Sequence, residues 1–143
     1  MVKIELNRTD DSYAFEAKDS NGHTVKMDGA AEIGGHNSGA RPMQLLLMAL
    51  GSCSGIDIVS ILKKQRQEIS NFKIIIEGER EQSKEPALWK HINVLFQFTG
   101  NIDEDKAKKA SALSIDKYCS VAATLRAAGC LIDWKVQVKN DKL

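Results

Sequence analysis

Three cysteines are the residues of this chain best able to carry chemistry: Cys53, Cys119 and Cys130. Cys53 lies in an apolar stretch, Cys119 lies near the end of a second helical pattern, and both are flanked by serine. A thiolate is a nucleophile, whereas a buried thiol often only fills space. The pair Cys53 and Cys119 is therefore a candidate for redox chemistry, while Cys130, which opens the last predicted strand, is interpreted as structural. Their odd number and wide spacing are not typical of a secreted disulfide framework.

The histidines offer fewer options. His36 lies in a glycine-rich loop that leads toward the Cys53 segment and could reach a pocket there. A Cys–His acyl-transfer site built from Cys53 and His36, with hydrolase activity, is one alternative. His23 and His91 lie on predicted strands and are expected at the surface. We predict no metal, because no Cys or His pair has the short spacing of structural zinc sites, and no cofactor.

The stretch Arg41–Gln67 must position Cys53. Pro42 suits the first turn of a helix. The residues Leu45–Leu50 are apolar on every face, which predicts a buried helix with a polar end. Cys53 lies roughly 16 Å along the axis from Pro42, beyond the reach of the helix dipole. A reactive thiolate at Cys53 would therefore require a cation from another segment or another subunit, since its neighbour Asp57, one turn along, is acidic.

Alternation of apolar and polar residues predicts six strands, three before the central helix and three after it. Asn21-Gly22 is a strong hairpin turn signal. The acids Asp103–Asp105 open a second helix, which is expected to reach Cys119, with Ser120–Ala128 as a short continuation. The order βββ-α-ββ-α-β predicts an α+β domain with hairpins. The predicted strands are Val2–Asn7, Tyr13–Ala17, His23–Asp28, Asn71–Gln82, Leu88–Thr99 and Cys130–Lys139.

The length, charge and apolar segments of the chain indicate what kind of protein it is. A chain of 143 residues predicts a single domain over residues 1–143 that can bury a core. The net charge of +1, with basic and acidic residues interspersed, argues against a nucleic-acid partner. No apolar signal segment is visible at the N-terminus. Gln44, Asp57 and several small residues interrupt the apolar segment Met43–Leu62, which argues against a membrane span. We therefore expect a cytoplasmic protein.

Three motifs resemble the OsmC/Ohr superfamily, which includes organic hydroperoxide resistance proteins and osmotically induced peroxidases. They are Arg41-Pro42-Met43-Gln44-Leu45, Gly51-Ser52-Cys53 and Lys117-Tyr118-Cys119-Ser120-Val121, within a similarity that spans roughly Gly34 to Val138. The resemblance implies an OsmC/Ohr-like fold: antiparallel sheets packed around two central helices in an intertwined homodimer, with two sites at the subunit interface. Met43 stands where peroxidase members have glutamate. The segment Gly35–Pro42, followed by Gly51-Ser52-Cys53-Ser54-Gly55, looks more like the uncharacterised OsmC-like branch than like either peroxidase branch.

The resemblance also implies a function, the thiol-dependent reduction of organic or other hydroperoxides in oxidative-stress defence. Cys53 matches the peroxidatic cysteine and Cys119 the resolving cysteine, which must come within disulfide reach, with Cα atoms roughly 4.4–6.8 Å apart. An external dithiol, such as a lipoylated protein, would reduce the disulfide. In the family the cation that stabilises the thiolate is an arginine of the N-terminal hairpin, where Arg8 is the only candidate here. Arg41, Arg126 or His36 would have to replace it. The alternative is a non-enzymatic module that binds a small ligand or senses redox state.

Overall fold

The computed structural model describes residues 1–141, and the chain forms two compact units that meet in sequence between Leu46 and Leu47. Each unit contains one three-stranded sheet. The helix α1 (Pro42–Lys64) begins in the first unit and runs on through the second. The element order, with three strands before α1 and three after it, is the order predicted from the sequence.

The first unit is built on an antiparallel meander in the order β1-β2-β3. The hairpin predicted at Asn21-Gly22 is present, and Gly22 adopts a φ of 88° that favours glycine. The strands are shorter than the sequence pattern indicates, because pairing of the first two strands extends only from Glu5–Lys18 to Arg8–Phe15. The elements are β1 (Glu5–Arg8), β2 (Phe15–Lys18), β3 (Thr24–Met27) and the 3₁₀ turn η1 (Ala31–Ile33).

A buried carboxylate organises the loop between β3 and α1. Asp28 is 2% exposed, and its oxygens accept hydrogen bonds from the backbone N–H groups of Gly29, His36 and Ser38 and from the Ser38 hydroxyl. These hydrogen bonds lower the pKa of Asp28 to about 2, against the opposing effect of burial. The bond from the Ser38 N–H is the largest cause. The carboxylate therefore stays ionised and fixes the loop as it enters the helix.

The sheet of the second unit has the order β4-β5-β6 and is mixed. Strands β4 and β5 pair antiparallel, but β5 and β6 pair parallel, so the prediction that the sheets are antiparallel is wrong for this pair. The helical connection between β5 and β6 carries the chain back along the sheet, as parallel neighbours require. The elements are β4 (Glu68–Arg80), β5 (Trp89–Asn101), α2 (Glu104–Leu113), the π-helical turn η2 (Ser114–Tyr118), α3 (Ser120–Ala127) and β6 (Leu131–Asn140).

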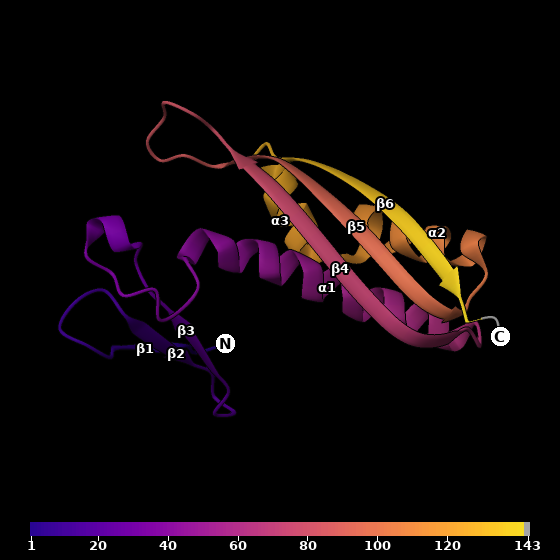
Figure 1. The fold of residues 1–143 in the computed structure, drawn as a ribbon, viewed down its shortest axis with the longest axis horizontal. Helices are drawn as coiled ribbons and strands as arrows, with labels where there is room; N and C mark the ends of the chain where they lie inside the picture. Colours follow the sequence, from indigo (N-terminus) through magenta and orange to yellow (C-terminus); the bar gives the residue numbers. More distant parts are fainter. Residues whose placement is uncertain (142–143) are drawn as a thin grey trace. The chain divides into compact units, whose positions relative to one another are not determined.

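The helices cover one face of this sheet, and the core of the second unit lies between the helices and the sheet (Figure 1). Phe96 and Phe98 of β5 are buried, and Phe72 of β4 stacks on Phe98 with ring centroids 4.3 Å apart. Gly51 and Gly55 let α1 lie close to β4, since a Cβ at either glycine would meet an isoleucine side chain of that strand at 2.9 Å. The close contact places the middle of α1 directly on the sheet.

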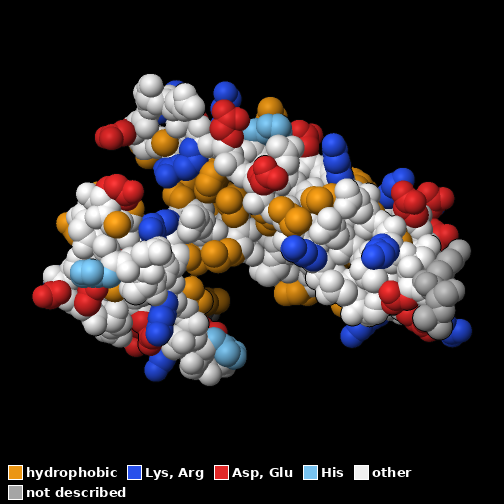
Figure 2. Space-filling model, in the orientation of Figure 1, with side chains coloured by type: hydrophobic (Ala, Val, Ile, Leu, Met, Phe, Trp, Pro, Cys, Tyr) orange, Lys and Arg blue, Asp and Glu red, His pale blue; other side chains and the backbone are white. Residues whose placement is uncertain are grey.

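One side of α1 is exposed, whereas the sequence predicts burial on every face. Met48 is 55% exposed and Ile56 is 71% exposed, and hydrophobic side chains reach the surface over this helix (Figure 2). By length and composition α1 could cross a membrane, with a mean hydropathy of 2.0 and 33% of the apolar window buried. Core helices of soluble proteins meet the same criteria, and here the other side of α1 packs on a sheet.

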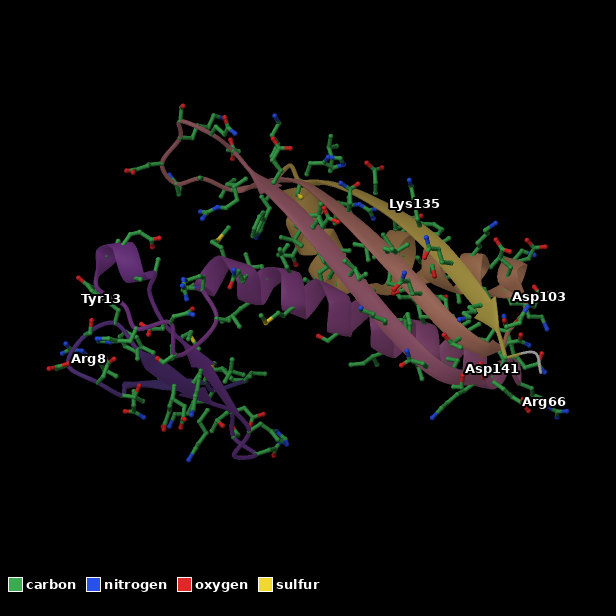
Figure 3. All side chains as sticks on the ribbon, viewed as in Figure 1. Arg8, Tyr13, Arg66, Asp103, Lys135 and Asp141 are labelled. Atoms are coloured by element: carbon green, nitrogen blue, oxygen red, sulfur yellow. The ribbon has the colours of Figure 1, made fainter. Side chains whose placement is uncertain are left out.

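Polar contacts close the end of the second unit at which α1 passes into β4. Figure 3 shows Arg66, Asp103 and Asp141 at this end. The Asp103 carboxylate accepts a hydrogen bond from the Lys106 N–H at 2.9 Å and caps α2, as the acidic start of this segment predicts. Its own N–H donates to the side-chain oxygen of Gln67 at 2.8 Å. These bonds tie the start of α2 to the segment that follows α1.

Candidate active site

Two thiols meet inside the second unit. Cys53 is half-buried on α1, and Cys119, which precedes α3, is 3% exposed. The two side chains lie close enough for Cys53 to act on the pKa of the Cys119 thiol. Both thiols are free, as is that of Cys130, so the contact belongs to the reduced protein. The structure thus brings together the two cysteines that the sequence singled out as a pair.

Cys119 holds its proton strongly. Burial is the largest cause, and the hydrogen bond with Cys53 adds to it, so that the pKa of the Cys119 thiol is raised to about 11. The Ala122 N–H at the start of α3 donates to the Cys119 sulfur at 3.4 Å and opposes this shift, but it does not offset the burial. At neutral pH Cys119 is therefore a protonated thiol that can donate a hydrogen bond to the Cys53 sulfur.

A π-helical turn carries Cys119 to this position. The helix α2 ends at Leu113, η2 follows, and the Cys119 N–H donates to the carbonyl oxygen of Ser114 at 2.8 Å. Cys119 has an extended backbone, with ψ of 105°, and serves as the N-cap of α3. The sequence predicts a helix that continues to Cys119, because no proline or glycine interrupts it. π-helical turns are frequent at functional sites.

A second link joins η2 to α1 beside the thiols. The Ser114 hydroxyl lies 3.0 Å from a carboxylate oxygen of Asp57 and 3.2 Å from the carbonyl oxygen of Ser54. Ser114 and Ser54 are fully buried. Asp57 lies one turn after Cys53 on the same helix, so this link is next to the thiol pair. Nothing in the sequence marks Ser114, because 57 positions separate it from Asp57.

The candidate residues Arg41 and His36 belong to the first unit. The Arg41 guanidinium donates to the carbonyl oxygen of Gly39 at 3.1 Å and to the side-chain oxygen of Asn37 at 3.2 Å. The His36 ring lies 3.3 Å from the Asp10 carboxylate and lines a hollow of about 370 Å³ in the same unit. The thiolate-stabilising role of Arg41 and the pocket role of His36 stay predictions.

Arg126, the other candidate cation, holds the π-helical turn. Its guanidinium donates to the carbonyl oxygen of Ile115 at 2.7 Å and to the Asp116 carboxylate at 3.0 Å. Its charge also acts on Cys130, whose thiol pKa is nevertheless raised, because burial outweighs the attraction. The Cys130 sulfur lies 3.5 Å from the carbonyl oxygen of Leu131. This third thiol lies outside the pair.

Three side chains of the first unit could by distance hold a cation. One ligand atom each from Asp10, Asp28 and His36 lies within 4.8 Å of the others. The Asp28 carboxylate already accepts backbone and hydroxyl hydrogen bonds, and His36 pairs with Asp10. We therefore assign Asp28 a structural role.

Comparison with known proteins places the fold in a family. The sequence model of the OsmC-like protein family matches residues 35–135. The chain is 40% identical over 122 residues to Protein YhfA of Escherichia coli K12, covering 82% of this chain and 85% of YhfA. The chain belongs to the OsmC-like protein family. The resemblance inferred from the cysteine motifs is thereby confirmed, within nearly the boundaries expected from the sequence.

Solved structures agree with this assignment. A hypothetical protein from Aquifex aeolicus VF5 is 34% identical, with a TM-score of 0.79 and coverage of 97% of this chain and 98% of that one. The organic hydroperoxide resistance protein OhrB of Bacillus subtilis is 17% identical, with a TM-score of 0.64 and coverage of 97% and 98%. The OhrB likeness shows the shared fold alone. The predicted OsmC/Ohr-like α+β fold is confirmed.

Proposed function

We propose that this protein is a cytoplasmic thiol-dependent reductase of organic hydroperoxides in which Cys53 and Cys119 form the redox pair. The observation that carries the proposal is that two free thiols, one of them deeply buried, lie close enough for Cys53 to act on Cys119. The family setting supports it, because a structural neighbour is named an organic hydroperoxide resistance protein. Oxidative-stress defence would then be the physiological role.

The different environments of the two thiols suggest their roles. Cys53 is half-buried and so is the more accessible sulfur, whereas Cys119 is buried and protonated at neutral pH. The thiolate is the attacking species in thiol chemistry. We assign Cys53 as the peroxidatic cysteine and Cys119 as the resolving cysteine, which also donates a hydrogen bond to Cys53.

The reaction balances with these two residues and an external dithiol. The Cys53 thiolate attacks the outer oxygen of the hydroperoxide, an S–O bond forms, and the O–O bond breaks. The departing alkoxide takes a proton from water and leaves as the alcohol, while Cys53 becomes a sulfenic acid. Cys119 gives up its proton as its sulfur attacks that of Cys53, and hydroxide leaves as water. A dithiol, such as a lipoylated protein, then reduces the disulfide by two electrons.

We propose that the protein works as a homodimer. Met48 and Ile56 expose apolar surface along α1, and Leu6, Phe15 and Val25 do so on the sheet of the first unit. Exposed apolar surface of this kind commonly marks an interface. Light scattering should give a mass about twice the 15.8 kDa of one chain, and a single species at the chain mass would contradict the dimer.

A turnover assay tests the activity. Purified protein is mixed with cumene hydroperoxide and either dithiothreitol or dihydrolipoamide, and peroxide loss is followed against a buffer blank. We expect catalytic consumption that Cys53→Ser abolishes and that Cys130→Ala retains, since Cys130 lies outside the pair. Loss no faster than the blank would contradict the proposal. The redox-sensing or ligand-binding alternative would then be examined by native mass spectrometry for a retained small molecule.

The cation is tested in the same assay. We expect Arg41→Met to slow the reaction with hydroperoxide, because an ion pair with arginine favours the thiolate. Arg66→Met, which changes an exposed arginine of the second unit, is the control. Equal rates for the two variants would remove Arg41 from the mechanism.

A further inference from the structure

We propose that Ser114 and Asp57 are positioning residues whose hydrogen bond holds Cys119 against Cys53 and so favours formation of their disulfide. The inference rests on the proposed function for its physiological meaning, but its test needs no hydroperoxide. It concerns the link between η2 and α1, which neither the cysteine motifs nor the family match identifies.

The contacts form a closed ring. Asp57 follows Cys53 by one turn of α1, and its carboxylate lies 3.0 Å from the Ser114 hydroxyl. Ser114 opens the π-helical turn, whose last hydrogen bond runs from the Cys119 N–H to the Ser114 carbonyl oxygen at 2.8 Å. The ring returns to α1 at Cys53, which lies close enough to Cys119 to act on the pKa of its thiol. Any movement of Cys119 away from Cys53 along α1 must therefore strain the Ser114–Asp57 bond or open the π-helical turn.

The Ser114–Asp57 hydrogen bond is strong enough to influence the position of the π-helical turn. Ser114 is fully buried, and a hydroxyl proton donated to a carboxylate makes one of the stronger hydrogen bonds in proteins. The Ser54 carbonyl oxygen, at 3.2 Å, is a second acceptor for the same proton. On the far side of the turn, the Arg126 guanidinium holds Ile115 and Asp116. The π-helical turn is thus attached to both helices that carry the thiols.

The Ser114–Asp57 link therefore raises the effective concentration of the Cys119 thiol near the Cys53 thiol. Formation of a disulfide within a chain depends on how often the two sulfurs meet in bonding geometry. If the Ser114–Asp57 link persists in the disulfide form, its loss frees the turn, and the pair becomes easier to reduce. The expected change is about tenfold in the equilibrium with an external dithiol, the size expected for loss of a hydrogen bond to a charged group.

The same segment supplies a matched control. Ser111 is also fully buried, but its hydroxyl donates to the Ala107 carbonyl oxygen within α2 at 2.8 Å. Ser111→Ala therefore removes a buried hydroxyl from the same connection and leaves the link to α1 in place. A role of Ser114 in stability alone would make Ser114→Ala and Ser111→Ala behave alike in redox measurements.

The experiment uses the full chain and five variants: Ser114→Ala, Asp57→Ala, the double variant, Ser111→Ala and Asp57→Asn. Each is equilibrated at pH 7 with mixtures of reduced and oxidised dithiothreitol, quenched in acid and alkylated. Peptide mass spectrometry then gives the fraction of Cys53–Cys119 disulfide. Circular dichroism confirms that each variant is folded, and Asp57→Asn, which keeps an acceptor, tests for partial rescue.

We expect Ser114→Ala to need an oxidised-to-reduced ratio about tenfold higher for half-oxidation. The double variant should match Ser114→Ala, because the two residues act through one bond, and Ser111→Ala should match the wild type. Equal behaviour of Ser114→Ala and Ser111→Ala would overturn the inference while leaving the proposed function intact. A wild-type protein that forms no Cys53–Cys119 disulfide would overturn both. If Ser114→Ala shows the expected tenfold shift but the wild type consumes no hydroperoxide, the inference is supported and only the proposed function is removed.

Discussion

Replacing Cys119 with alanine should change how the stability of the protein depends on alkaline pH. The pKa of Cys119 is raised from 9.0 to about 11, chiefly by burial and then by the hydrogen bond with Cys53. The folded protein therefore keeps a proton that the unfolded chain releases as the pH rises. Stability due to Cys119 is fully present below about pH 9 and is lost as the pH rises through about 11.

The size of the effect follows from the two pKa values. A pKa difference of two units corresponds to about 3 kcal/mol, reached above pH 11. Between pH 8 and pH 10 the loss is about 1 kcal/mol, because the unfolded thiol ionises over this range and the folded thiol hardly does. Alanine has no proton to lose, so Cys119→Ala should lack this part of the pH dependence.

Urea unfolding under reducing conditions at pH 8 and pH 10, at one protein concentration, measures it. The difference in unfolding free energy between wild type and Cys119→Ala should change by about 1 kcal/mol between the two pH values. Cys130 is present in both proteins, so its contribution cancels. In a Cys53→Ala background the change should shrink but persist, because burial is the larger cause. An unchanged difference at pH 8 and pH 10 would refute this account of the site.

Two further predictions concern the scaffold. The pKa of Asp28 is lowered to about 2, so its contribution to stability should be lost as the pH falls from about 4 through 2. In thermal unfolding, the stability of the wild type should therefore fall more steeply with acid than that of Asp28→Asn. Parallel curves would contradict the role of the Asp28 carboxylate in holding the loop. Gly100 has a φ of 145°, and a Cβ there would collide with the carbonyl oxygen of Glu68. Gly100→Ala should destabilise the protein by about 1–3 kcal/mol in urea unfolding. Gly129→Ala should destabilise it less, because φ is also positive there but a Cβ would meet no atom within 4 Å. The reverse order would be inconsistent with the β4–β5 packing.

Local patterns in the sequence were sufficient to predict much of the fold. Alternation along β4 and β5 predicted which side chains face the core, and Asp103 and its neighbours predicted the start of α2, because such signals lie within a few residues. The first strands came out shorter than predicted, since alternation cannot show where a partner strand ends. Pairing of Glu5 with Lys18 marks that end.

The remaining features depend on contacts between distant segments. Parallel pairing of β5 with β6 is decided by the path of the helical connection and not by the composition of either strand. The π-helical turn and the bond from Ser114 to Asp57 have no local signal. The exposure of Met48 and Ile56 depends on how much of α1 one sheet can cover. The sequence predicted which two cysteines pair, but only the fold shows that Cys53 lies close enough to Cys119 to act on its pKa.

A single-turnover oxidation most directly tests the claim that Cys53 and Cys119 form the redox pair. Reduced protein is treated with one equivalent of cumene hydroperoxide, denatured, alkylated and mapped by peptide mass spectrometry. We expect one disulfide joining the Cys53 and Cys119 peptides, with Cys130 recovered as the alkylated free thiol. Recovery of all three cysteines as free thiols, or a disulfide that includes Cys130, would contradict the account.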